Sequence, residues 1–195
     1  MDTKEKILAA AETILRQGEE LHVRPLARRS GVSVGTVYNA YSTIDELVLE
    51  LAARFWDGIA DIIRDSCNRA VSISVVQSAA REWISVVENR RFLFALNRHP
   101  ALCRILPADS IPAIALKNVQ KSIILCLHEH HPQLDDATIY RMAVSYTLLF
   151  RFLQSGLCEQ MPLTKSGEDK YEFMLDAMDD LVTYVNKGIK AENGL

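Results

Sequence analysis

Residues 26–47 read LARRSGVSVGTVYNAYSTIDEL, and they carry the clearest helix-start and helix-end signals of the N-terminal part of the chain. Gly31 fits the left-handed position that follows the end of a helix, and Ser33 fits the cap that starts the next one. Thr43 followed by Glu46 is a capping-box pattern that opens a further helix. The stretch therefore predicts two short helices joined by a tight turn, with another helix directly after them.

The residues before this stretch predict one more helix. Asp2, with Glu5 three residues later, fits an N-terminal cap, and the helix that it opens ends near Gly18. Pro25 falls in the first turn of the following helix, where its missing N–H costs nothing. Short helices around a tight Gly-containing turn are the arrangement of a helix-turn-helix.

The third short helix carries little apolar bulk, which is typical of a helix that enters the DNA major groove. Val34 and Val37 are expected to anchor it to its neighbours. Between Leu21 and Ile44 the chain has arginines and no carboxylate, a local positive region within a chain of net charge −3. The side chains expected to point outward, and the arginines beside them, are Gly35, Thr36, Tyr38, Asn39, Tyr41, Arg24, Arg28 and Arg29.

This N-terminal segment resembles the TetR family of transcriptional regulators, over about Asp2 to Leu51. The residues at matching positions are Leu26, Ala27, Gly31, Val32, Ser33, Gly35, Thr36 and Tyr38. The resemblance implies that Thr36 and Tyr38 contact phosphates and that Val34, Gly35 and Asn39 lie near bases. It also implies that the fourth helix connects this head to a ligand-binding body. The DNA-binding candidates are then Arg24, Arg28, Arg29, Ser33, Val34, Gly35, Thr36, Tyr38, Asn39, Tyr41 and Thr43.

The chain departs from the family pattern at the start of the fourth helix. The family often has a lysine where this chain has Ile44, and His-Phe where it has Ala40 and Tyr41. A missing lysine removes one phosphate contact and reduces the salt dependence of DNA binding. Alternatively, Ile44 is an apolar residue that packs the fourth helix against the first, as residues near a cap often do.

Apolar residues recur at helical spacing through the rest of the chain, and strand patterns are nearly absent. We therefore expect an all-α protein with a DNA-binding domain at residues 1–47 and a helical ligand-binding and dimerisation domain at 48–195. Helices are expected near Val75–Asn89, Ser110–His130, Asp136–Ser155 and Glu168–Lys187. The sequence NRHP, residues 97–100, marks one of the breaks between them.

The body is expected to bind a small apolar or aromatic effector, because its bulky residues suit the walls of a pocket between helices. Core packing is the alternative role for each of them. The candidates are Trp83, Val87, Phe92, Phe94, Met142, Tyr146 and Phe150.

Residues 139–153 predict a helix that is apolar on two faces, one with Ile139, Met142 and Tyr146, the other with Tyr140 and Val144. One face can cover the core of the body and the other a partner subunit. The resemblance to the TetR family, in which the two C-terminal helices of each subunit form a four-helix bundle, also predicts a homodimer. The alternative is a core within one chain.

Other classes of protein lack sequence support. We find no Gly-rich phosphate loop, no Ser-centred elbow and no paired carboxylates, so we expect neither an enzyme nor a cofactor. The spacing of His128, His130 and His131 does not fit a zinc-protease motif, and the cysteines lack C-x-x-C spacing, so we expect no metal site. No apolar run is long enough for a membrane span, and we expect a cytoplasmic protein.

Two hypotheses of function remain open. The first is a homodimeric, ligand-responsive transcriptional regulator, a repressor in most relatives, that binds a palindromic double-stranded DNA operator. The second is a helical small-molecule-binding protein whose head has lost operator recognition. Ile44, Ala40 and the pI of about 6.0 make this alternative conceivable.

Overall fold

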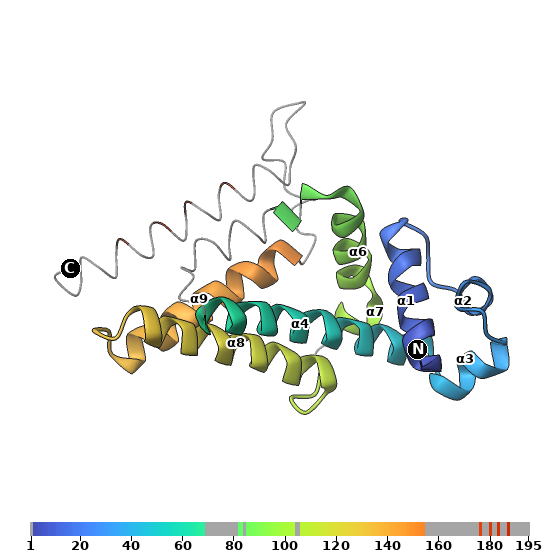
Figure 1. Cartoon of the computed structure of the whole chain (residues 1–195), viewed down its shortest axis with the longest axis horizontal. Helices are drawn as coiled ribbons and strands as arrows, with labels where there is room; N and C mark the ends of the chain where they lie inside the picture. Colours follow the sequence, from blue (N-terminus) through green and yellow to red (C-terminus); the bar gives the residue numbers. More distant parts are fainter. Residues whose placement is uncertain are drawn as a thin grey trace. The chain divides into compact units, whose positions relative to one another are not determined.

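A computed structural model of the chain describes residues 2–68, 82, 83, 85–103 and 106–154, side chains up to 147, and the single positions Asp176, Asp180, Thr183 and Lys187. These residues form α-helices and no strand, which confirms the all-α prediction (Figure 1). The helices are α1 Thr3–Arg16, α2 Val23–Ser30, α3 Val34–Ala40, α4 Ile44–Asn68, α6 Val87–Arg98, α7 Pro100–Cys103, α8 Ile111–His130 and α9 Asp136–Gln154.

The ends of α1 and α2 are fixed by the residues that the sequence indicates. The Asp2 carboxylate accepts a hydrogen bond of 2.6 Å from the backbone N–H of Thr3. Gly31 ends α2 with φ of 69°, a left-handed conformation that L side chains rarely adopt. Gly18 has φ of 77° and follows α1 directly after its C-cap Gln17. These positions make α1 and α2 separate helices that lie against each other.

The start of α4 is held by a reciprocal cap. The Thr43 hydroxyl accepts from the Glu46 N–H at 3.1 Å, and the Glu46 carboxylate accepts from the Ser42 N–H at 2.8 Å. The capping-box prediction is confirmed, with the glutamate reaching the residue before Thr43. This fixes the direction in which the chain leaves α3.

The chain divides into two compact units. The first unit comprises Met1–Asp57 and Trp83–Leu116. Its core joins α1, α2, α3, the start of α4 and α6 in one buried cluster. The members of this cluster are Ile7, Leu8, Ala10, Ala11, Ile14, Leu15, Leu26, Ala27, Val37, Tyr41, Leu47, Val48, Leu51, Ala52, Phe92 and Leu96.

The second unit comprises Gly58–Glu82 and Lys117–Leu195. Its described buried side chains come from the second half of α4, from α8, from α9 and, at Leu134, from the turn between α8 and α9. They include Ala60, Ile63, Cys67, Val119, Ile123, Cys126, Leu127, Ile139, Met142 and Ala143. Helix α4 runs through both units without a break. The domain boundary that we expected between residues 47 and 48 falls inside this helix. The assignment of DNA binding to residues 1–47 stays a prediction.

Helix α6 was not predicted as a separate element. We expected a helix to end near Asn89, but the structure starts a new one there: Val86 is extended, and the N–H groups of Asn89 and Arg90 donate to its carbonyl oxygen. The break at residues 97–100 is confirmed, since α6 ends at Arg98 and α7 begins at Pro100. The expected helices at 110–130 and 136–155 correspond to α8 and α9, whereas most of those at 75–89 and 168–187 lies outside the described residues.

Candidate nucleic-acid interface

Helix α3 is anchored by one side chain and exposed on its opposite face. Val37 is 2% exposed and lies in the core with α1 and α2. Val34, which we expected to be a second anchor, is instead 39% exposed, and Tyr38 is 53% exposed. Gly35 and Asn39 are exposed as well. These four residues, Val34, Gly35, Tyr38 and Asn39, form what we call the α3 surface.

The start of α3 is rigidly capped. The Ser33 hydroxyl accepts from the Thr36 N–H at 3.0 Å, and the two hydroxyl oxygens are hydrogen-bonded at 2.8 Å. Both hydroxyls are therefore engaged in the cap, although Ser33 stays exposed and Thr36 is half-buried. Such a cap satisfies a backbone N–H group of the first turn of α3, which carries Val34 and Gly35.

Packing among the described residues does not require a glycine at position 35. Of these residues, a Cβ added there would meet the Ser33 hydroxyl oxygen at 3.7 Å, which is an ordinary contact. The missing side chain instead makes the α3 surface flat next to Tyr38 and Asn39. A flat helix surface allows another molecule to approach its backbone closely.

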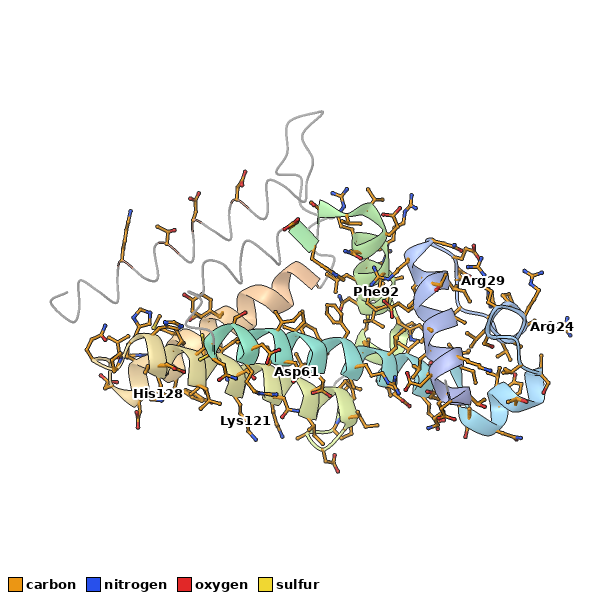
Figure 2. The ribbon with its side chains drawn as sticks, viewed as in Figure 1. Arg24, Arg29, Asp61, Phe92, Lys121 and His128 are labelled. Atoms are coloured by element: carbon orange, nitrogen blue, oxygen red, sulfur yellow. The ribbon has the colours of Figure 1, made fainter. Side chains whose placement is uncertain are left out.

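The predicted arginines divide into two kinds. Arg24 and Arg28 are exposed on α2, and Figure 2 shows Arg24 extending away from the helix. Arg29 instead donates to the Glu19 carboxylate at 2.7 Å and to the Gln17 amide oxygen. The positive charge of Arg29 is thus balanced within the head, and Arg24 and Arg28 carry the positive charge of this region.

Tyr41 does not point outward as expected. It is 5% exposed and belongs to the core cluster, because the chain turns into α4 directly after α3. The Lys4 ammonium lies 5.0 Å from the centre of the Tyr41 ring. Burial, together with the nearby Glu50 carboxylate, raises the pKa of the Tyr41 hydroxyl far above its ordinary value. Tyr41 is therefore placed to support the head rather than to meet a ligand at the α3 surface.

The two residues that begin α4 have packing and capping contacts. Thr43 is exposed, but its hydroxyl accepts the Glu46 N–H described above. Ile44 is half-buried and packs against the core cluster. This contact supports the interpretation of Ile44 as a packing residue rather than as the place of a lost phosphate contact.

Arg16 was not predicted, and it connects α1 with α6 in the first unit. Its guanidinium pairs with Glu12 at 2.6 Å, donates to the Asn89 amide oxygen, and lies 5.2 Å from the Phe92 ring centre and 5.9 Å from that of Trp83. Glu12 and Arg16 are four residues apart, a spacing in the sequence that indicates an ion pair on one helix. No sequence pattern connects either residue to α6.

The expected effector residues fall into both units. In the first unit, Trp83 and Phe92 each lie near Phe55, with ring centres 5.6 and 5.8 Å away. Phe92 is 2% exposed and lies in the core (Figure 2), whereas Val87 is 43% exposed. Phe94 is half-buried with Arg98 over its ring at 4.6 Å.

In the second unit, Met142 is 2% exposed and Tyr146 is half-buried. The side chain of Phe150 lies outside the described residues. Of these candidates, Trp83 and Phe92 are brought together around a common residue, Phe55. A pocket formed by the whole set stays a prediction.

The described residues hold no cluster of His, Cys, Asp or Glu that could bind a metal ion. His128 lies in the last turn of α8 (Figure 2), 3.9 Å from the Asp136 carboxylate. Among the helices that the structure describes, none is long and apolar enough to cross a membrane.

No model of a protein family matches the chain, and a search of curated proteins finds no match. Among solved structures, the chain is similar to a protein from Pseudomonas aeruginosa PAO1 that is described as a candidate transcriptional regulator. The TM-score is 0.56, the sequences are 18% identical, and the match covers 92% of this chain and 90% of that one. At this identity the likeness shows the fold alone, and it extends over nearly the whole length of both chains.

Proposed function

We propose that the chain is a ligand-responsive transcriptional regulator of the TetR type, which represses transcription by binding a palindromic operator as a homodimer. The observation that carries the proposal is the α3 surface: a short capped helix whose outer face has an amide, a phenol, a glycine and one small apolar side chain, Val34. A helix of this kind fits the major groove, which is about 12 Å wide.

Each exposed residue then has a distinct role. Asn39 offers both a donor and an acceptor to base edges, as an amide does when it pairs with adenine. The Tyr38 hydroxyl can donate to a phosphate, and Arg24 and Arg28 supply the positive charge that attracts the DNA backbone. Val34 and Gly35 allow close approach, and Val34 can contact a thymine methyl group.

The proposed dimer uses α9 and the helix predicted at 168–187. In α9, Ile139, Met142 and Ala143 are buried, whereas Tyr140 on the second face is 56% exposed. This division supports a helix with one face on its own core and one face available to a partner. The regulator description of the similar Pseudomonas protein supports the same function for this fold.

The proposed response to an effector depends on a ligand-binding site in the body. The candidate residues for this site are the apolar and aromatic residues of both units. Helix α4 supports the proposed response, because this helix carries core residues of the head and continues into the second unit. A ligand that shifts the second half of α4 could therefore change the position of the head.

The test is a gel-shift titration of DNA from upstream of the chain's own gene, in the absence and presence of small aromatic ligands. The wild-type chain is expected to form a discrete complex that suitable ligands weaken. Asn39→Ala should lose base preference, while Asn68→Ala, a change of an exposed residue near the end of α4, should leave binding unchanged. A chain that binds ligands but no DNA sequence in preference to another would instead support the alternative, a binding protein without operator recognition.

A further inference from the structure

Two buried cysteines of the second unit have no part in the proposed DNA binding. Cys67 near the end of α4 is 5% exposed, and Cys126 in α8 is 1% exposed. Both are free thiols. The Glu129 carboxylate, which is exposed on α8, acts on both thiols.

A contact between α4 and α8 brings the two thiols near each other. Cys126 and Glu129 are three residues apart in α8 and lie on one face of that helix. The Cys67 thiol donates to the Glu129 carboxylate across the two helices, with Sγ and Oε2 3.1 Å apart. Cys67 therefore meets the face of α8 that also carries Cys126, and the two thiols interact closely enough to affect each other's pKa.

The surroundings keep both thiols protonated. Burial, followed by the hydrogen bond to Glu129 and the neighbouring Cys126, raises the pKa of the Cys67 thiol to about 12. Burial also raises the pKa of Cys126. Since the thiolate is the nucleophile, neither cysteine reacts quickly without a base that removes its proton. Glu129 is such a base, because it already accepts the Cys67 hydrogen bond and is open to water.

We propose that Cys67 and Cys126 form a reactive thiol pair that closes to a disulfide when the chain meets a hydroperoxide. Glu129 takes the Cys67 proton as the sulfur attacks the peroxide oxygen, which gives a Cys67 sulfenic acid and an alcohol. The Cys126 sulfur then attacks the Cys67 sulfur, the S–S bond forms, and hydroxide leaves and is protonated to water. In total, two thiols and ROOH give a disulfide, ROH and H2O.

The disulfide would join α4 to α8 within the second unit and would fix the second half of α4. Cys103 behaves differently, because it is exposed and its thiol donates only weakly, at 3.4 Å, to the Asn97 carbonyl oxygen. It can react with a hydroperoxide but has neither a buried thiol partner nor a carboxylate among its described contacts. The inference does not depend on DNA binding.

The experiment treats the full chain with hydrogen peroxide, blocks the remaining thiols by alkylation and maps the digest by mass spectrometry. A linked peptide that contains Cys67 and Cys126, two hydrogen atoms lighter than its reduced parts, is expected in the wild type and in Cys103→Ser. It should be absent in Cys67→Ser and in Cys126→Ser, and circular dichroism shows whether these variants are folded. Oxidation of Cys103 without this linked peptide would overturn the proposal.

The pH dependence of the closure rate tests the role of Glu129. The titratable groups that act on Cys67 are Glu129 and Cys126, both in α8. With Glu129 as base, the wild-type rate should change little between about pH 7 and 9, because the reaction then does not depend on the fraction of free thiolate. In Glu129→Gln the reaction needs free thiolate, so the rate should start lower and rise about tenfold per pH unit. The same steep rise in the wild type would show that Glu129 takes no proton.

Discussion

The guanidinium of Arg29 and the carboxylate of Glu19 form an ion pair of 2.7 Å that holds α2 against the turn after α1. Arg28, one residue earlier, is exposed and has no ion-pair partner among the described residues. The ion pair therefore distinguishes Arg29, which supports the proposed DNA-binding head, from Arg28, which would contact DNA.

Arg28→Gln and Arg29→Gln are expected to differ in salt dependence. Loss of a phosphate contact at Arg28 should reduce the slope of log affinity against log salt by about 0.9 per subunit and leave the melting temperature unchanged. Arg29→Gln should cost about 0.5 kcal/mol of stability, since the pair is near the surface, and should leave the slope unchanged. Salt-titrated anisotropy and thermal melting measure both effects. Equal slopes for the two variants would contradict this assignment.

Tyr38→Phe and Tyr41→Phe form a second matched pair. Each removes one hydroxyl, from a ring that is 53% exposed in Tyr38 and 5% exposed in Tyr41. Tyr38→Phe is expected to weaken binding to all DNA sequences alike, by about 1 kcal/mol for one lost hydrogen bond. Tyr41→Phe should leave DNA affinity unchanged, because the buried ring still packs. Weaker DNA binding by Tyr41→Phe, with an unchanged melting temperature, would show that the Tyr41 hydroxyl meets DNA.

Ile44→Lys is expected to destabilise the head. The Ile44 side chain packs against the core cluster, so a lysine there loses apolar contact and must turn its charge to solvent. The melting temperature should fall, and the salt slope of DNA binding should stay the same. Ile44→Leu, which keeps the apolar volume, serves as the control. An unchanged melting temperature with a slope steeper by about one unit per subunit would instead reveal an unused phosphate site.

The Asp135 carboxylate makes the stability of the second unit depend on pH. It accepts a hydrogen bond of 2.7 Å from the Thr138 N–H, and this bond lowers the pKa of Asp135 below its ordinary value. A carboxylate with a lowered folded pKa stabilises the fold above its unfolded pKa, and this contribution is lost as the pH falls through the folded value. Asp135→Ala should therefore lower the melting temperature at pH 7 and have less effect near pH 3.

Asp135→Asn is the control for this prediction, because asparagine also caps a helix but does not titrate in this range. Its melting temperature should lie closer to that of the wild type at pH 7. An alanine effect of the same size at both pH values would contradict a role for the charged carboxylate.

Local patterns were sufficient to predict the ends of the N-terminal helices. Asp2, Gly31, Ser33 and Thr43 act on backbone groups within a few residues, so their roles can be recognised in the sequence. The start of α6 was missed, because apolar spacing continues through Val86 and only the backbone conformation shows the break. Helix boundaries depend on such details more than the existence of a helix does.

Contacts of the tertiary structure distinguish the candidate residues that support the head from those that are exposed for DNA binding. Arg29 is balanced by Glu19 from the turn before α2, and Tyr41 is buried because α4 leaves α3 at the angle set by its cap. Neither property can be predicted from the type of the residue or its neighbours. The same holds for Arg16, whose partner Asn89 is far away in the sequence.

Selection of binding sites for the full chain from random double-stranded DNA shows whether the α3 surface reads DNA sequence in a dimer. We expect enrichment of an inverted repeat whose half-site centres lie about 34–36 Å, or a multiple of this distance, apart. Asn39→Ala should select a repeat with a relaxed base at one position of each half-site. No enriched sequence with the wild-type chain, or the same repeat selected by Asn39→Ala with unchanged preference, would show that the α3 surface does not read DNA in this way.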